Sequence, residues 1–483
     1  MGDFGSEKPR VKENGDGEQG ISRENIEARL PVRTVTESEE TKTLLRATWA
    51  LAWPVVLEQA LSMVSQVVDM AMVGRLGAES VAAIGLSMQP FFLINAVFMG
   101  LSVGTTSLCA RATGAKNREE AGKVAGQSIV VAFIFGVIVS YLGFLKSDWI
   151  IAFMKAEIPV RALGASYVKA MMPGMLLFFV FTVSTAALRG AGDTTTPMLV
   201  NLGINVIHVF TNYLLIFGYL GFPALGVTGA GISTSISRIL GGAAMLYVLS
   251  RPRGKLTVDW KKTVREFDWA LFRRILNIGV PAAMERVLTS TGQIAYARQV
   301  AGLGTQAYAA HSLSLNVESF SYMPGMGFAT AATSLVGQRL GAKDPSGAEK
   351  SAIIATKMAV MTMGSMGLMF FLFPGQFLRI FTDDPDIIAR GVPLLRIVAF
   401  TQIPEAIGFV IPGALRGAGD TRIAMYVTVA GVWVVRLGLT YLLMEVFGLG
   451  LAAAWIAMFS DWVVRSSLYW IRLKRGKWKE IKV

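Results

Sequence analysis

The chain of 483 residues has little of what stabilises or drives many other proteins. A single cysteine, Cys109, excludes an internal disulfide, and two histidines exclude a histidine-rich metal site. No G-x-x-x-x-G-K-[ST] sequence is present, which argues against an ATP-driven pump. Charged residues make up only 16% of the chain, whereas a soluble domain usually carries about 25%. Much of the surface must therefore be solvated by something other than water.

Long apolar stretches are abundant, and hydrophobic residues make up 53% of the chain. The stretches are about 20 residues long, the length that crosses a bilayer as a helix. Because backbone in lipid must satisfy its own hydrogen bonds, we predict an all-α polytopic membrane protein. Twelve transmembrane helices are predicted, at about 47–71, 84–109, 122–145, 163–188, 197–218, 224–249, 271–297, 307–336, 352–374, 389–415, 423–446 and 449–472.

Charge is distributed unevenly between the ends and links of these helices. Residues 1–46 are charged and poor in large apolar residues, which predicts a disordered tail and not a signal peptide. Lys and Arg gather in the linker 251–270 and the tail 476–483, while alternate links such as 219–225 have none. This asymmetry predicts a cell membrane protein with both termini and the basic linker in the cytoplasm. The net charge of +13 is thereby explained without nucleic acid.

The sequence repeats itself at a constant offset. Residues 187–194 read ALRGAGDT, and the same letters recur 227 positions later at 414–421. We therefore predict two parallel six-helix lobes, 47–250 and 271–475, around a central cleft. The same offset relates Pro54 to Pro281, Glu58 to Glu285, Gln66 to Gln293 and Gly77 to Gly304.

The two ALRGAGDT segments are interpreted as hinges or latches at the predicted cytoplasmic ends of two helices, and not as ligand sites. In each segment an aspartate, Asp193 or Asp420, precedes the next helix and is expected to cap it.

Ionisable residues within the apolar helices are costly and usually mark a function. The first predicted helix carries Glu58 and Asp69, whose spacing of eleven residues places them on one face together with Gln66. The repeat of this helix has Glu285 and Gln293, but Tyr296 stands where an equivalent of Asp69 would be. Asp69 is therefore the leading candidate for binding a coupling ion.

Further polar residues occur in other predicted helices. Asn201, Asn205, His208 and Asn212 share one face of the helix at 197–218. They could bind a cation or relay a proton with Asp69, or they could bond one helix to another. Glu318 and Glu405 are candidates for the cavity wall of the second lobe. Four further charged residues are interpreted as structural, with Asp461 and Arg465 expected to pair along one helix: Arg238, Arg436, Asp461 and Arg465.

Over residues 45–475 the chain resembles the multidrug and toxic compound extrusion (MATE) transporters. The marks are Asp69 fifteen residues after Pro54, MVGRLG at 72–77, the two LRGAGDT turns, NYLLIFG at 212–218, and AAH at 309–311 followed by VGQRLG at 336–341. The resemblance implies a secondary antiporter that exports cationic or amphipathic compounds by alternating access, in exchange for H⁺ or Na⁺ bound at Asp69.

Two departures and matches bear on the coupling ion. Members of the family often have Asn and Asp on helix 5, where this chain has His208 and Asn212, so the identity of the ion stays open. Other members use acids on helices 7 and 10, where Glu285 and Glu405 lie.

Alternative functions remain open at this point. A flippase or exporter of a lipid-linked or metabolite substrate would use the same fold, although a flippase predicts a basic cavity and these stripes are acidic or neutral. A membrane enzyme is disfavoured because no paired Asp-rich metal motif lies in a span, and a scaffold would not explain the matched Glu58 and Glu285. We expect a monomer that meets a small molecule and lipid, with no cofactor apart from the ion and no metal site.

Overall fold

The computed structural model describes residues 37–252, 254–481 and 483. Helices and helical turns make up the secondary structure of this part of the chain, with no strand in it. Most of the predicted disordered tail, residues 1–36, lies outside the described residues. From Glu37 onward the chain is helical, so the first helix begins ten residues before its predicted start at 47. The chain divides into two units between Thr43 and Leu44, and the candidate site residues lie in the second unit.

The first half contains six long helices, as predicted. Pro54, Pro90 and Pro173 lie inside three of them, and Asn117 caps another by accepting a hydrogen bond from the backbone N–H of Glu120. The helices are α2 (Glu37–Gly74), α3 (Ala78–Gly114), α4 (Arg118–Leu145), α6 (Ile158–Gly190), α7 (Thr195–Phe217) and α8 (Gly226–Ser250), with the short α5 (Ser147–Phe153) after α4.

The second half repeats the pattern with one irregular helix. Its sixth-from-last to last long elements are α10 (Trp269–Ala301), α11 (Thr305–Gly341), α12 (Pro345–Leu372), α14 (Pro385–Gly417), the run α15 (Thr421–Ala430), η1 (Gly431–Arg436), α16 (Leu437–Tyr441) and η2 (Leu442–Val446), and α17 (Gly450–Arg475). Short elements are α9 (Trp260–Arg265), α13 (Pro374–Arg379) and η3 (Lys477–Glu480). The segments η1 and η2 are π-helical, a geometry that often occurs at functional sites.

The twelve predicted spans are confirmed as twelve long helical runs. Within the described residues, nine of these runs are long and apolar enough to cross a membrane by length and composition. The other three, α10, α11 and α17, are more polar; α10 alone carries Arg273, Arg274, Glu285, Arg286 and Arg298. Their length and their place in the repeat make them the remaining spans.

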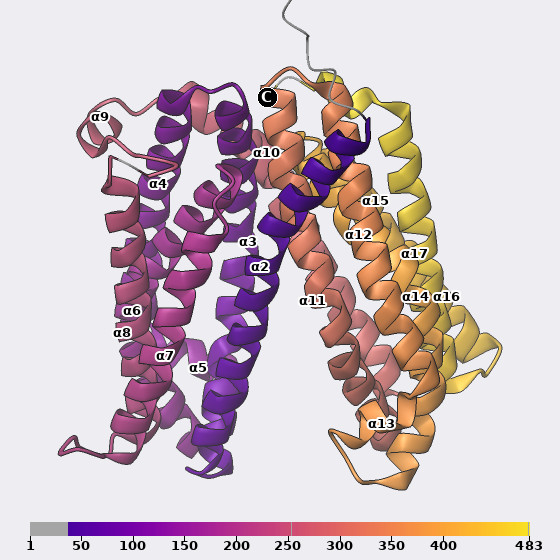
Figure 1. The fold of residues 1–483 in the computed structure, drawn as a ribbon. Coiled ribbons are helices and arrows are strands. Elements are labelled where there is room, and N and C mark those ends of the chain that lie inside the picture. The colour runs from indigo at the N-terminus through magenta and orange to yellow at the C-terminus, as the bar shows by residue number, and fades with distance from the viewer. Residues whose placement is uncertain (1–36, 253, 482) are drawn as a thin grey trace, which may run out of the picture. The chain divides into compact units, whose positions relative to one another are not determined.

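Each half has its own packing centre. In the first half α6 packs against α3, α4 and α8, and in the second half α14 packs against α11, α12 and α17. The halves meet where α3 contacts α10 and α11, in the middle of the helices of Figure 1. Glycines permit this approach, because a Cβ at Gly100 or Gly104 would overlap the backbone of α10.

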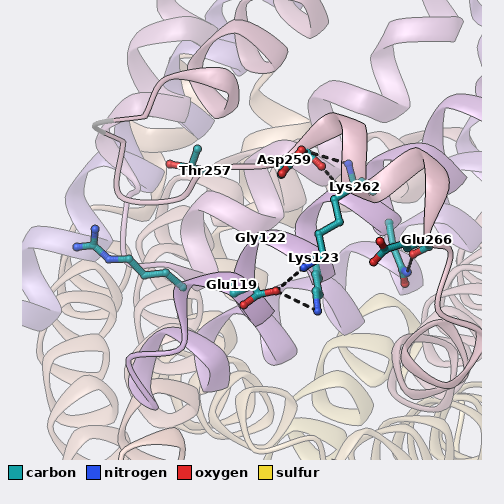
Figure 2. Close-up of a pocket in the computed structure, with 10 residues that line it drawn as sticks. Glu119, Gly122, Lys123, Thr257, Asp259, Lys262 and Glu266 are labelled. Carbon is teal, nitrogen blue, oxygen red and sulfur yellow. Dashed lines mark hydrogen bonds and ion pairs between the residues drawn. The ribbon is translucent and has the colours of Figure 1, made fainter.

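The basic linker and the tail are folded onto one end of the helices, which we name the basic end. Leu256 and Val258 of the linker are buried, and Trp478 of the tail is fully buried with its indole N–H donating to the Leu473 carbonyl. The linker and the first turn of α4 enclose a cavity of about 330 Å³ (Figure 2). There Lys262 Nζ lies 2.7 Å from Glu119 Oε1, and this hydrogen bond raises the pKa of Lys262 above its usual range. None of the predicted site residues lines this cavity.

Candidate functional site

Asp69 lies at the centre of a polar cluster between α2 and α7. Its Oδ1 accepts a hydrogen bond of 2.7 Å from Asn212 Nδ2, and its Oδ2 lies 3.5 Å from His208 Nδ1. His208 Nε2 lies 3.3 Å from the Thr234 hydroxyl on α8. The Asp69 side chain keeps 30% of its surface exposed, so a small ion or a ligand can reach it. The predicted facing of the α7 polar stripe toward α2 is therefore what the structure shows.

Glu58 forms a second cluster nearer the basic end. Its carboxylate accepts from Arg189 Nη2 at 2.6 Å and from Asn201 Nδ2 at 3.1 Å. Asn205 in turn donates to the Asn201 side-chain oxygen at 2.5 Å. Glu58 is 5% exposed, and its charge is compensated by the guanidinium of Arg189. Such a paired and buried carboxylate holds α2, α6 and α7 together.

The second half repeats the Glu58 cluster position by position. Glu285 accepts from Arg416 Nη2 at 2.7 Å and from the Thr428 hydroxyl at 3.0 Å. Arg416 and Thr428 lie 227 residues after Arg189 and Asn201. A group that both halves keep with the same partners joins the helices of each half and does not distinguish the halves.

The acids predicted for the cavity wall of the second half lie close together. Glu318 on α11 and Glu405 on α14 are 6% and 4% exposed, and their carboxyl groups are hydrogen-bonded to each other. Gln402 Nε2 also donates to Glu405 Oε2 at 3.4 Å, and Ser321 donates to the Gln402 side-chain oxygen. A carboxylate has no donor, so a hydrogen bond between two carboxyls requires one proton. This pair can hold a proton.

The predicted pairing of Asp461 with Arg465 is confirmed. Asp461 is fully buried and accepts from Arg465 Nε at 2.7 Å and from Arg436 Nη2 at 2.8 Å. Arg436 is the last residue of the π-helical segment η1. Two guanidinium groups thus share one carboxylate inside the second half.

Three predicted site residues stand apart from these clusters. Gln66 and Gln293 are exposed, and no hydrogen bond of their side chains occurs among the described residues. Tyr296 is buried and donates to the Ala454 carbonyl at 2.9 Å, and its ring stands edge-on to His311. Tyr296 therefore packs inside the second half and offers no carboxylate in place of Asp69.

The capping prediction holds for one aspartate and is wrong for the other. Asp193 accepts from the backbone N–H and the hydroxyl of Thr196, as expected of a cap. Asp420 precedes α15 but makes no capping hydrogen bond. Its carboxylate accepts from Arg472 at 2.7 Å instead, because a charge-assisted bond is stronger than a bond to a backbone N–H.

The sequence analysis missed Arg189, Arg416, Thr428 and Thr234 as partners of the acids. The available signal was the repeat itself, since Arg189 and Arg416 occupy the same position of the two ALRGAGDT segments. A repeated arginine inside two apolar helices predicts a repeated carboxylate partner.

The MatE family pattern matches residues 54–214 and 281–442, two segments that begin 227 residues apart, as the sequence repeat does. The chain belongs to the MatE family. As a MatE protein it is a multi-pass membrane transporter, and the resemblance stated from its motifs is confirmed. The acids of the two halves are then the ionisable groups of a transporter and not of an enzyme.

Individual relatives of this MatE protein cover nearly its whole length. A probable multidrug resistance protein NorM of Thermotoga maritima is 34% identical over 92% of this chain and 95% of that protein. An uncharacterised transporter, YisQ of Bacillus subtilis, is 28% identical over 89% and 94%. A solved structure described as the outward-facing conformation of a multidrug resistance MATE family transporter of the MOP superfamily is 23% identical, with a TM-score of 0.83 over 90% of this chain and 98% of that chain.

Proposed function

We propose that this MatE protein is a secondary antiporter that exports cationic or amphipathic organic compounds in exchange for H⁺ or Na⁺. The observation that carries the proposal is Asp69, a partly exposed carboxylate inside a membrane helix that is held by neutral partners. An ionised Asp69 attracts a cationic compound, whereas a proton or Na⁺ at the same carboxylate removes that attraction. Two ligands that exclude each other at one group are coupled.

The surroundings of Asp69 suit a small cation as well as a proton. Asn212 is 2% exposed, and its side-chain oxygen has no hydrogen-bond partner in the structure. A buried oxygen without a donor is costly unless a ligand satisfies it, and an amide oxygen beside a carboxylate is a ligand set for Na⁺. His208 offers the alternative route, since an imidazole beside Asp69 and Thr234 can carry a proton.

The second half supplies the next candidate for proton coupling. The hydrogen bond between Glu318 and Glu405 requires one proton. Arg436 acts on both carboxyls, so loss of that proton would change the balance of charge around the π-helical segment. We assign the primary site to Asp69 because its side chain is more exposed than these two residues.

The orientation follows from charge. The basic end carries the linker and the tail with their Lys and Arg residues, and the positive-inside rule places such an end in the cytoplasm. We therefore propose that both termini are cytoplasmic, in the cell membrane. Because one chain supplies both halves, a monomer surrounded by lipid suffices for the transport cycle.

Ethidium efflux from bacterial cells without their own drug pumps tests this function. Cells that make the protein should lose preloaded ethidium faster than cells with the empty vector. The difference should disappear when a protonophore collapses the proton gradient, or when Na⁺ is removed if Na⁺ is the coupling ion. If the protein reaches the membrane and neither ethidium nor another organic cation leaves faster, cation export is wrong. A lipid-linked or metabolite substrate would then take its place.

A further inference from the structure

The end of α6 is held by a helix of the other half. Ser334 Oγ on α11 donates to the Arg189 carbonyl at 2.7 Å, and Gln338 Nε2 donates to the Gly190 carbonyl at 2.9 Å. Both carbonyls belong to the last turn of α6, whose final carbonyls have no partner within the helix. Side chains of the second half therefore satisfy the backbone of the first half.

The end of α14 is held in the opposite direction. Ser107 Oγ on α3 donates to the Gly417 carbonyl at 3.2 Å, and Arg111 Nη2 donates to the Ala418 carbonyl at 2.8 Å. Ser107 and Arg111 lie 227 residues before Ser334 and Gln338. The same contact is thus made twice, once from each half to the other.

Close packing of α3 against α11 accompanies these hydrogen bonds. A Cβ added at Gly114 would overlap the backbone of Gln338, and one added at Gly341 would overlap the backbone of Arg111. Ser107 and Ser334 are both fully buried. The two helices therefore leave no room for a solute between them at the basic end.

We propose that Ser107, Arg111, Ser334 and Gln338 form a latch that keeps the halves closed at the basic end and releases when the transporter opens to that side. Separation of the halves breaks all four hydrogen bonds at once, because each donor and its acceptor belong to different halves. The acceptors are backbone carbonyls, so the latch depends on the placement of the two RGAG turns and not on a charge partner. The proposal rests on transport by alternating access, and it names the residues that position the closed state.

The two arms of the latch are unequal. Arg111 is a cation at the carbonyl end of α14, where the helix dipole favours positive charge, whereas Gln338 is neutral. Arg111 Nη2 also donates to the Ile481 carbonyl of the folded tail at 2.9 Å. Loss of Arg111 should therefore favour opening more than loss of Gln338.

The chain provides a matched control next to each serine of the latch. Thr106 Oγ1 donates to the Ala186 carbonyl at 3.0 Å, and Thr333 Oγ1 donates to the Gly413 carbonyl at 2.8 Å. These bonds have the same chemistry and the same repeat offset, but each stays within one half. Separation of the halves leaves them intact.

Spin labels on the two halves measure the opening directly. Lys116 and Lys343 are exposed, follow α3 and α11, and occupy equivalent positions of the repeat. Lys116→Cys and Lys343→Cys, in a Cys109→Ala background, carry the labels in lipid nanodiscs. Ser334→Ala and Gln338→Ala should each raise the ratio of long to short label distances about threefold to tenfold, the effect of one lost hydrogen bond. Arg111→Ala should raise it more, and Thr333→Ala and Thr106→Ala should leave it unchanged.

Equal distance distributions in Ser334→Ala, Gln338→Ala and Thr333→Ala would overturn the latch. A long-distance shift in Thr333→Ala as large as in Ser334→Ala would do the same, since it would show a general loosening. If Arg111→Ala fails to fold, the two mild variants on α11 decide the result. The label distance does not depend on which compound is exported. An unchanged ratio with normal ethidium export would therefore reject the latch alone, whereas a shifted ratio without export would reject only the proposed substrate.

Discussion

Replacing Asp69 with asparagine is expected to reduce ion-driven drug export on the order of tenfold or more, the loss expected when the coupling between two ligands is removed. Asparagine keeps the shape of the side chain and a hydrogen bond to Asn212, but it has no charge to offer to a cation or a proton. His208 would face a neutral group in place of the Asp69 carboxylate. The measurement is the initial rate of ethidium efflux at matched amounts of protein in the membrane.

Gln66→Ala is the control for this prediction, because Gln66 lies on the same helix, is exposed and belongs to none of the described clusters. It should export at the wild-type rate. Normal export by Asp69→Asn would remove Asp69 from the transport cycle. Glu405 and Glu318 would then become the primary candidates for coupling.

Replacing Asp461 with asparagine is expected to lower the free energy of unfolding by about 3–5 kcal/mol, the usual effect of removing one member of a buried ion pair. Asp461 is fully buried and is the shared acceptor of Arg436 and Arg465. Asparagine would leave both guanidinium groups without their carboxylate. Unfolding of the purified protein in mixed micelles, followed by tryptophan fluorescence, gives the measurement.

The control makes the same chemical change at an exposed acid. Asp383→Asn, in the link before α14, should change the free energy of unfolding by less than about 0.5 kcal/mol. A second variant that combines Asp461→Asn with Arg436→Met should recover part of the lost stability, because fewer unpaired charges stay buried. Equal stability of Asp461→Asn and Asp383→Asn would show that the buried pairs contribute little.

The two halves share a scaffold and differ in where they place ionisable groups. Both keep the glutamate–arginine pair of Glu58 and Glu285, and both keep the serine of the latch. The equivalents of Asp69, His208 and Asn212 in the second half are Tyr296, Val435 and Leu439. Conversely, the equivalents of Glu318, Glu405 and Asp461 in the first half are Phe91, Phe178 and Thr234. Each half therefore has one set of groups that the other lacks, on different helices.

Most of the fold could be predicted from the sequence, because apolar length and the offset of 227 act on every helix alike. The predicted ends fell short mainly where polar residues continue a helix beyond the apolar core, as in α2 and α11. The folding of the linker and the tail was missed, since Val258 and Trp478 are too few to produce an apolar pattern.

The candidate site could be predicted in its ionisable members and not in their partners. Helical spacing placed Asp69, His208 and Asn212 correctly, because it depends only on one helix at a time. The contacts of Arg189 with Glu58 and of Ser334 with the Arg189 carbonyl join helices 131 to 145 residues apart. Periodicity carries no information about which helices meet, so those contacts needed the structure. Gln66 shows the opposite case, since it lies near the predicted face but makes no contact with the cluster.

The most direct test of the central claim counts the ions released when a substrate cation binds. Tetraphenylphosphonium binding to the purified protein, measured by calorimetry in buffers of different ionisation enthalpy, gives the number of protons, and a Na⁺-selective electrode gives the number of Na⁺ ions. We predict that wild type releases about one H⁺ or one Na⁺ per bound cation and that Asp69→Asn releases none, since one carboxylate exchanges one charge. The same release from wild type and Asp69→Asn would contradict the assignment of coupling to Asp69.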